Sequence, residues 1–329
     1  MSIIVAHVIA LVNVVEEAKS LRKISRHPIK WFVVLLAMVG AAWLFFVGPA
    51  LSDQCFSRTG AVTPNLETVE PFLTNGDAGK QVLRAVQSGD PGEVRRLISA
   101  NPTLLSTKTV LPDGTRPYNG NSADLVSLAV TRCDREMVTT LLDLGADPSG
   151  AIPGLALTYA ILADDTSLAT VLLNAGASPD ASAPGFNTPM HEALMFENTE
   201  GIALLASYGA DVNRADVFGG VALGTAVMTG NWEAAQVLMD AGANPWLVGN
   251  KGVLPAYRIY ANEPQGSDAV RIRDDLLARV RADAPFWPPP NAAEVSRNFL
   301  DGTWPTEAMR ANGFEASEGA MRSMRAAFQ

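Results

Sequence analysis

Hydrophobic and polar positions follow a helical period through the body of the chain. Apolar residues recur at helical spacing, as in Met137, Val138, Leu141 and Leu142, and so line one face of a helix. A glycine then ends the apolar stretch, where the left-handed conformation that commonly closes a helix costs glycine little. The pattern predicts an all-α body of short helices joined by polar loops.

Residues 31–51 follow a different pattern, because these 21 residues carry no charge. As a helix they are about 32 Å long, enough to cross the hydrocarbon core of a bilayer. We expect one uncleaved transmembrane helix. A cleaved signal peptide is the alternative, but the apolar run is longer than such a peptide needs and no good A-x-A cleavage site follows it.

Residues 1–30 set the expected orientation of this helix. They hold five basic and two acidic residues, a net charge of +3, and the basic ones directly precede the span. The positive-inside rule places them in the cytoplasm and the chain after Leu51 on the other side. We expect a single-pass protein of the bacterial inner (cytoplasmic) membrane with a periplasmic domain; cytoplasmic repeats are the alternative. The apolar residues 2–15 either lie on the membrane or form a second span.

Four segments of the body align with one another. Their glycines, Gly145, Gly176, Gly209 and Gly242, are 31, 33 and 33 residues apart. An alanine column and a leucine column share this spacing: Ala129, Ala160, Ala193 and Ala226; Leu141, Leu172, Leu205 and Leu238. Each unit reads as helix, short turn, helix and outward loop. One unit cannot bury its own apolar face, so several units stack into a continuous core.

The copy that begins at Thr188 carries the clearest motif. It contains Thr188, Pro189, His191 and Ala193, and it is followed by Gly-Ala-Asp-Val-Asn at residues 209–213. These residues resemble the T-P-L-H-x-A and G-A-D-V-N motifs of the ankyrin repeat family. The resemblance implies that the His191 side chain hydrogen-bonds backbone groups and ties neighbouring repeats together. Only this copy keeps T-P-x-H, and Glu197 replaces the glycine expected between its helices.

The resemblance implies an ankyrin-repeat solenoid of about five to six repeats over residues 78–262, with degenerate terminal copies. Residues 52–77 are polar and rich in Pro and Gly, which predicts a flexible tether. Residues 263–329 hold further helical stretches around Trp287-Pro-Pro-Pro290. We expect a helical C-terminal cap there, the alternative being a peptide that docks a partner.

The charge of the body limits its partners. Residues 52–329 hold 20 basic and 32 acidic residues, a net charge of −12, which argues against nucleic-acid binding and favours a protein partner with a basic patch. Two cysteines and three histidines leave little material for a metal site. Neither a phosphate-binding loop nor a pair of carboxylates in one cleft stands out. We expect no catalysis, cofactor, metal or small-molecule substrate.

The two cysteines are candidates for an intramolecular disulfide in an oxidising compartment. Cys55 lies just after the predicted span, and Cys133 lies at the turn between the helices of its repeat. The nearness of Cys55 to the membrane and the expected packing of Cys133 disfavour the bond, and the sequence leaves the pairing open.

Candidate partner-binding residues lie on the loops and first helices, which line a concave face in this fold. They are Arg116, Tyr118, Tyr159, Phe186, Phe218 and Trp246. Leu128, Glu192 and Thr225 align with Tyr159 and are expected on the same face. Aromatic side chains on a rigid scaffold are favoured contacts. The alternative is that Phe186, Phe218 and Trp246 pack loop against loop.

The sequence therefore predicts a membrane-anchored protein–protein interaction module. Two more specific roles stay open: an immunity or inhibitor protein that neutralises a toxin or effector in the periplasm, and a regulatory subunit of a membrane complex.

Overall fold

The chain forms two compact units in a computed structural model, residues 1–54 and 55–329. The structure describes residues 56, 64, 66–111, 122–163, 165–182, 187–284, 287–303, 305–311 and 314–327, all in the second unit. The predicted segment 1–30 and the predicted span 31–51 lie outside the described residues. Within the described ranges, no helix is long and apolar enough to span a membrane.

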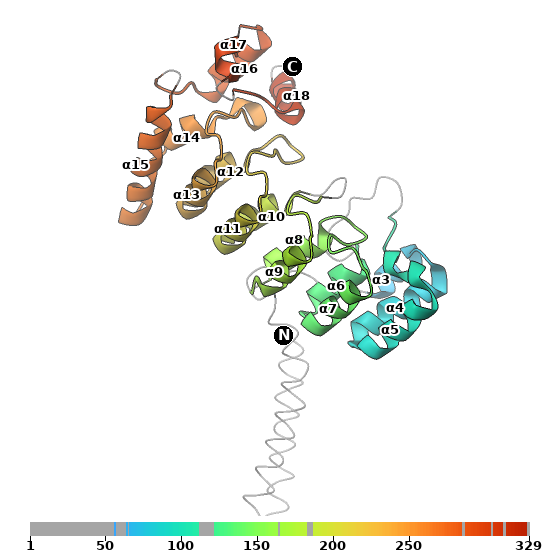
Figure 1. Cartoon of the computed structure of the whole chain (residues 1–329). Helices are drawn as coiled ribbons and strands as arrows, with labels where there is room; N and C mark the ends of the chain where they lie inside the picture. Colours follow the sequence, from blue (N-terminus) through green and yellow to red (C-terminus); the bar gives the residue numbers. More distant parts are fainter. Residues whose placement is uncertain are drawn as a thin grey trace, which may run out of the picture. The chain divides into compact units, whose positions relative to one another are not determined.

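The second unit is built from helix pairs that stand side by side in a row, with the loops on one side of it (Figure 1). The first helices of the pairs are α4 (Gly76–Ser88), α6 (Leu125–Thr131), α8 (Leu155–Leu162), α10 (Pro189–Met195), α12 (Ala222–Thr229) and α14 (Pro255–Ala261). The second helices are α5 (Pro91–Ala100), α7 (Arg135–Asp143), α9 (Ser167–Asn174), α11 (Thr199–Ser207), α13 (Trp232–Asp240) and α15 (Ser267–Ala282). Each first helix contacts the next first helix, so the pairs stack in chain order.

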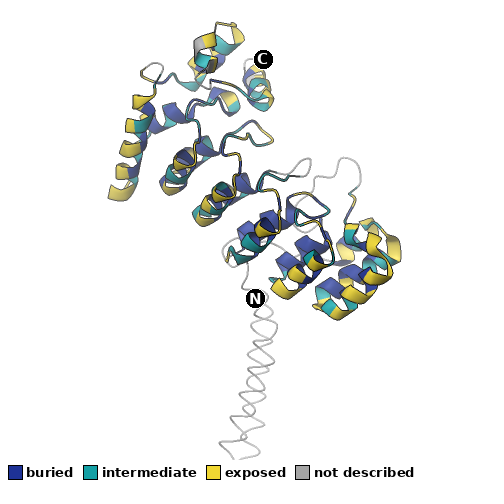
Figure 2. Ribbon diagram, in the orientation of Figure 1, coloured by how far each residue is buried: buried dark blue, intermediate teal, exposed yellow. Residues whose placement is uncertain are grey.

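The burial pattern explains why the pairs stack. The first helices are largely buried, whereas the outward side of the second helices is exposed (Figure 2). The alanine column lies fully buried on the first helices, where small side chains let neighbouring helices approach closely: Ala129, Ala160, Ala193 and Ala226. The leucine column is fully buried on the second helices: Leu141, Leu172, Leu205 and Leu238. Stacking therefore joins these side chains into one continuous core.

The ends of the second helices follow from their sequence. Asp90, Asp134, Asn198 and Asn231 each accept a hydrogen bond from the backbone N–H three residues later, which caps the helix N-terminus. After the second helices, the four glycines of the repeat column adopt φ values of 80° to 96°. No atom would lie within 4 Å of a Cβ there, so it is the left-handed backbone, and not a lack of space, that requires glycine.

A ladder of hydrogen bonds joins four successive loops, those that precede α8, α10, α12 and α14. Ser149, Asp180 and Asn213 stand one repeat apart, and each side chain accepts a bond from the backbone N–H of the following repeat. The donors are Ser178 (3.2 Å to Ser149 Oγ), Asp211 (3.0 Å to Asp180 Oδ2) and Asn244 (2.7 Å to Asn213 Oδ1). We call these three bonds the loop ladder. It fixes the register of one repeat against the next.

The residue two places before two of the three ladder acceptors has a local role. Asp147 and Asp211 accept a bond from the backbone N–H of Ser149 and Asn213 respectively, at 2.8 and 2.9 Å. Such a bond closes a turn that the side chain makes with its own backbone. In the G-A-D-V-N signature, the first polar residue thus shapes the loop and the second joins it to the next repeat.

The T-P-x-H motif acts at the start of α10. Thr188 Oγ1 lies 2.8 Å from His191 Nδ1, and Thr188 caps the helix by accepting a bond from the His191 backbone N–H. The His191 Nε2 atom is buried and has no hydrogen-bond partner among the described residues. Burial lowers the pKa of His191; nearby Arg214 also lowers it, whereas Asp216 and the backbone of Gly220 raise it.

Asp124 takes the place of Thr188 in an earlier copy. It is fully buried; its Oδ1 accepts from the Ser127 N–H and its Oδ2 from the Ile152 N–H, both at 2.7 Å. The first bond caps α6, and the second holds the loop that leads to α8. The Asp124 carboxylate therefore caps the N-terminus of α6 and also joins two repeats.

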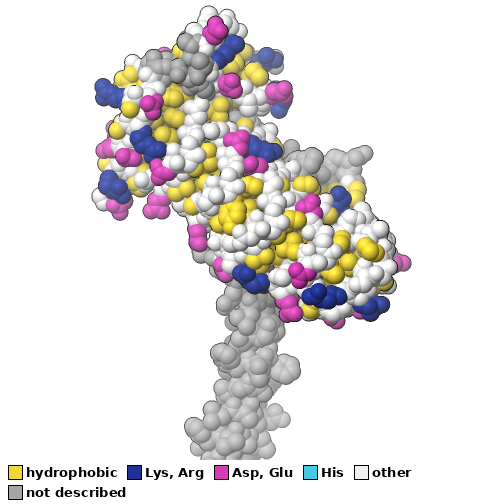
Figure 3. All heavy atoms as spheres, in the orientation of Figure 1, with side chains coloured by type: hydrophobic (Ala, Val, Ile, Leu, Met, Phe, Trp, Pro, Cys, Tyr) yellow, Lys and Arg dark blue, Asp and Glu magenta, His cyan; other side chains and the backbone are white. Residues whose placement is uncertain are grey.

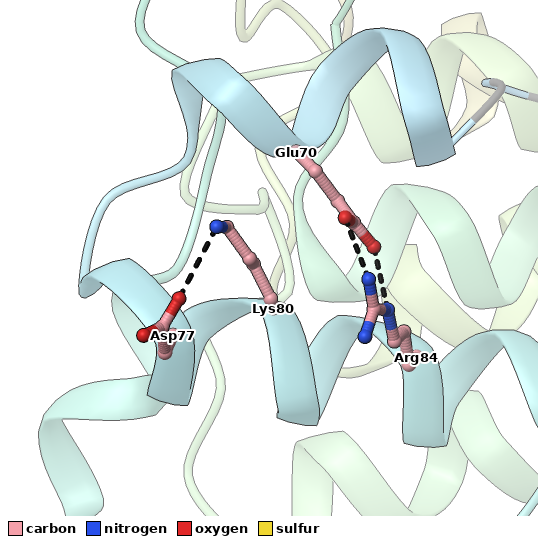
Figure 4. Close-up of polar contacts among 4 residues, drawn as sticks. All are labelled: Glu70, Asp77, Lys80 and Arg84. Carbon is pink, nitrogen blue, oxygen red and sulfur yellow. Dashed lines mark hydrogen bonds and ion pairs between the residues drawn. The ribbon is translucent and has the colours of Figure 1, made fainter.

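The first pair is covered by a helical segment, which corrects part of the predicted tether. Residues 52–77 were expected to be flexible, but α3 (Leu66–Val69) and the 3-10 helix η1 (Glu70–Phe72) form within them, and Val69 is fully buried. Figure 4 shows Glu70 and Arg84 of α4 joined by two parallel hydrogen bonds of 2.6 and 2.7 Å. These bonds lower the pKa of Glu70. The apolar side chains of α3 explain why this segment packs.

The predicted cap, residues 263–329, contains the second helix of the last pair. This helix, α15, packs against α13 and α14, and its Arg279 pairs with Asp240 at 2.7 Å. Short helices flank the pairs or follow them: η2 (Pro102–Ser106), η3 (Asn250–Gly252), α16 (Ala292–Leu300), α17 (Glu307–Ala311) and α18 (Glu318–Ala327). Both α16 and α18 pack against η3. Helices after α15 thus pack on the segment that precedes α14.

We predict that Asp124→Ala destabilises the protein by about 2–4 kcal/mol. Loss of the helix cap costs about 1 kcal/mol, and the buried Ile152 N–H loses its acceptor at a further 1–3 kcal/mol. Asp90→Ala is the matched control, because Asp90 caps α5 from an exposed position and is expected to cost only about 1 kcal/mol. Denaturant unfolding of the full-length protein measures both. Equal losses in the two variants would contradict the dual role of Asp124.

We also predict that His191 makes stability depend on pH. Because burial lowers the folded-state pKa of His191, the unfolded chain binds the proton more tightly. The stability from neutral His191 is therefore complete above the unfolded pKa of about 6.5 and is lost as pH falls below it. Melting temperatures between pH 7.5 and 5.5 should fall more steeply for the wild type than for His191→Gln. Parallel curves would show that the protonation of His191 is not coupled to folding.

Candidate partner-binding surface

The structure separates the six predicted contact residues into three groups. Arg116, Tyr118 and Phe186 lie outside the described residues. Tyr159 and Trp246 are buried. Phe218 is exposed over 60% of its surface. Of the described members of the set, only Phe218 is therefore placed to meet a partner directly.

Tyr159 was expected on the concave face, and this expectation is wrong. It lies on α8, whose eight residues are all buried, and its ring is fully covered. The ring of Phe56 packs edge-on against it, with 6.5 Å between ring centres. Leu128, expected on the same face, is also fully buried. Because every side of α8 is apolar, it can be covered on both faces, and Phe56 contributes to that cover.

Trp246 was expected to be exposed at a loop tip, and this expectation is also wrong. It occupies the next position of the ladder column after Asn213, but its ring packs on Phe314 with 5.3 Å between ring centres. The adjoining Val248 N–H donates to the Glu315 carbonyl at 2.9 Å. Trp246 is thus where the loop ladder stops and the C-terminal segment attaches.

Phe218 stands on a loop whose backbone is held in place. The Asp216 carboxylate accepts bonds from the backbone N–H groups of Phe218 and Gly220, both at 2.7 Å. Gly219 touches the backbone of α18, since a Cβ at this position would lie 2.2 Å from the Ala320 nitrogen. The loop is therefore fixed before binding while the Phe218 ring faces solvent, and this reduces the entropy lost on association.

Two methionines on the first helices are also exposed, and they were not among the predicted contact residues. Met195 ends α10 and Met228 lies near the end of α12, one repeat apart at equivalent positions. Their exposed fractions are 64% and 57%, whereas Leu162, at the same position one repeat earlier, is buried. The alignment of the repeats could have revealed them, because Met195 and Met228 each lie three residues after a residue expected on the concave face, Glu192 and Thr225. We name Met195, Phe218 and Met228 the apolar ridge.

Glu192 and Thr225 lie beside this ridge, half-buried. Glu192 Oε1 accepts a bond from Asn187 Nδ2 at 3.0 Å, and the same amide lies 3.8 Å from Met195 Sδ. Burial raises the pKa of Glu192, and the Asn187 bond opposes that effect. Glu192 and Thr225 therefore have the half-exposed position expected of them.

A cavity of about 360 Å³ adjoins the ridge between α12 and α14. Met228 and Thr225 form one side of it, and Arg258 of α14 and Lys251 of η3 bring positive charge to it. Two other cavities lie elsewhere: about 650 Å³ around Asp124, and about 560 Å³ around Trp232 and the start of α15. The cavity beside the ridge is the one that combines exposed apolar and charged side chains.

On the face seen in Figure 3, hydrophobic side chains reach the surface over the middle helix pairs, while charged side chains are more frequent toward the two ends. Within the described ranges, no group of three His, Cys, Asp or Glu side chains could hold a metal ion.

Cys133 takes part in a disulfide bond. It lies between α6 and α7 in the left-handed conformation, with φ of 53°. Cys55, the second cysteine of the sequence, lies outside the described residues.

The comparisons with known proteins agree with this geometry. The family model described as "Ankyrin repeats (3 copies)" matches residues 157–248, which include most of α8, all of α9 to α13 and the ladder bonds of Asp180 and Asn213. An ankyrin repeat protein of Acanthamoeba polyphaga mimivirus is 30% identical over 101 residues, which cover 26% of this chain and 62% of the viral protein. The chain thus spans less than two thirds of that relative. The stacked helix pairs, the loop ladder and the T-P-x-H motif agree with this similarity of residues 157–248 to ankyrin repeats.

Proposed function

We propose that the protein is a membrane-anchored interaction module that binds a protein partner through its loop tips and first helices. The observation that carries the proposal is the apolar ridge, because three large apolar side chains remain exposed on two consecutive repeats. Large apolar side chains that are exposed on a rigid scaffold are candidates for contact with a partner. Repeat solenoids use the surface formed by successive repeats for binding.

The scaffold supports this role because it holds the ridge in a fixed geometry. The loop ladder joins the loop of the repeat that contains Met195 to the next loop through Asn213 and Asn244. The Asp216 bonds fix the loop that carries Phe218. A contact surface that is ordered before binding loses less conformational entropy when the partner arrives.

We further propose that the repeats lie outside the cytoplasm, anchored by the uncharged segment 31–51. The net charge of +3 before this segment supports that orientation. The disulfide at Cys133 supports it independently, because disulfides persist in oxidising compartments and are rare in the cytosol. Since the chain holds two cysteines, we propose Cys55 as the partner of Cys133.

The first test of this proposal is crosslinking of a protein to the apolar ridge. A photoreactive amino acid at Phe218 or at Met228 should give a crosslinked protein adduct of one defined mass in intact cells. The same group at Arg271, an exposed residue of α15, is the matched control and should give none. Adducts at Arg271 but not at the ridge would place the binding surface elsewhere.

The second test addresses the compartment. A maleimide polymer added to the denatured, unreduced protein should leave both cysteines unmodified, and prior reduction should allow both to react. Cys133→Ser should release one thiol that reacts without reduction. Full modification of the wild type before reduction would contradict both the disulfide and the oxidising compartment. A phosphatase fused after Gln329 should be active if the repeats are exported.

A further inference from the structure

The cavity beside the apolar ridge carries a second chemical signal. Among the cavity-lining side chains, Arg258 and Lys251 are basic and Asp216 is acidic. The Asp216 carboxylate already accepts two backbone N–H groups. The Asp216 carboxylate therefore has fewer acceptor sites left for the two cations.

Arg258 and Lys251 differ from the cations of this unit that form ion pairs. Arg84, Arg273 and Arg279 each contact a carboxylate at 2.6–2.7 Å. Among the described residues, the side chains of Arg258 and Lys251 have no hydrogen-bond or ion-pair partner. Arg258 is also half-buried, so its guanidinium has given up part of its hydration without gaining a carboxylate. An anionic group entering the cavity would supply the missing partner.

The backbone at Lys251 is held in an uncommon conformation. Its φ is 56°, in the left-handed region that non-glycine residues rarely adopt. Two C-terminal helices hold it there: the Lys251 N–H donates to Ser323 Oγ at 2.8 Å, and its carbonyl accepts from Ser296 Oγ at 3.3 Å. The C-terminal helices thus fix the backbone of Lys251, whose ammonium group forms no ion pair among the described residues. Strain of this kind commonly accompanies a binding site.

Asn250 adds an unpartnered polar atom to the same cavity. Its Oδ1 is buried and has no hydrogen-bond partner among the described residues. Because the two ends of an amide look alike, this atom can be either an acceptor or a donor. In both cases it favours a polar ligand with which it can form a hydrogen bond.

The first helices give this site a direction. Glu192, Thr225 and Arg258 occupy equivalent positions on α10, α12 and α14, and neighbouring helices of this kind lie about 8–10 Å apart. The row therefore begins with a carboxyl, passes the apolar ridge and ends with two cations. A bound segment has to place a carboxylate at the Arg258 end and an apolar side chain on the methionines.

We propose that the cavity and the apolar ridge together bind a peptide segment in which an Asp or Glu lies next to a large apolar residue. This proposal rests on the proposed function and names the chemistry of the partner. It also differs from the expectation of a basic partner patch, since the local charge of the cavity is opposite to the −12 of residues 52–329. Nucleic acid fits less well, because only two cations are present and they adjoin methionines.

The test is selection of a random peptide library against the full-length protein in detergent. Selected peptides should be enriched in an acidic residue within a few positions of Leu, Met or Phe. With Arg258→Glu or Lys251→Glu, the acidic preference should disappear, and a peptide selected on the wild type should bind at least tenfold more weakly. Arg271→Glu is the matched control, because it changes the net charge equally on exposed α15 and should leave binding unchanged.

Several outcomes would overturn the proposal. Peptides without an acidic preference, equal losses in Arg271→Glu, or no selected peptide would each do so. So would equal competition by an oligonucleotide or by phosphatidylglycerol vesicles. Melting temperatures of the variants separate loss of the site from loss of the fold. Met228→Ser is a second variant that tests the apolar contact, because it leaves both cations in place. Crosslinking at Phe218 without an acidic preference would retain the proposed function and reject this inference alone.

Discussion

The loop ladder is the interaction on which the arrangement of this protein depends. A single pair of short helices cannot bury its apolar face, so stability comes from the contact of each pair with its neighbours. The hydrophobic core supplies most of that stability but does not by itself fix one register. Ser149, Asp180 and Asn213 do so, because each binds a backbone N–H of the following repeat. The loops that precede α8, α10, α12 and α14 are thereby joined to one another.

The ladder also explains the two ends of the row. A fourth acceptor after Asn213 would need another loop of the same kind, and at this position the chain carries Trp246, which packs on Phe314. The C-terminal segment therefore replaces a missing repeat. It does more than cover apolar surface, since Ser296 and Ser323 hold Lys251 in its left-handed conformation. At the other end, α3 and η1 cover α4, where Glu70 binds Arg84.

Much of the fold could be predicted from the sequence, because repetition makes local rules visible. The glycine, alanine and leucine columns correspond to helix ends, close helix contacts and the core. Contacts outside the repeats could not be predicted. Nothing in the residues around Tyr159 indicates that Phe56, more than one hundred positions earlier, packs on it.

The candidate surface was harder to predict for a related reason. Aromatic residues on loops were expected to be exposed, which holds for Phe218 but not for Trp246, and the difference depends on a distant phenylalanine. Met195 and Met228 were overlooked because apolar residues on helices are normally read as core. Their exposure becomes visible only once the neighbouring helices are placed.

Hydrogen–deuterium exchange of the free full-length protein tests the central claim most directly. The account predicts that the backbone N–H groups of Ser178, Asp211 and Asn244 exchange slowly, although they lie in loops, because each is bonded to the preceding repeat. The neighbouring loop N–H of Val217, which has no ladder bond, should exchange much faster. Equally fast exchange at all four positions would contradict the claim that the loop ladder holds the repeats in register.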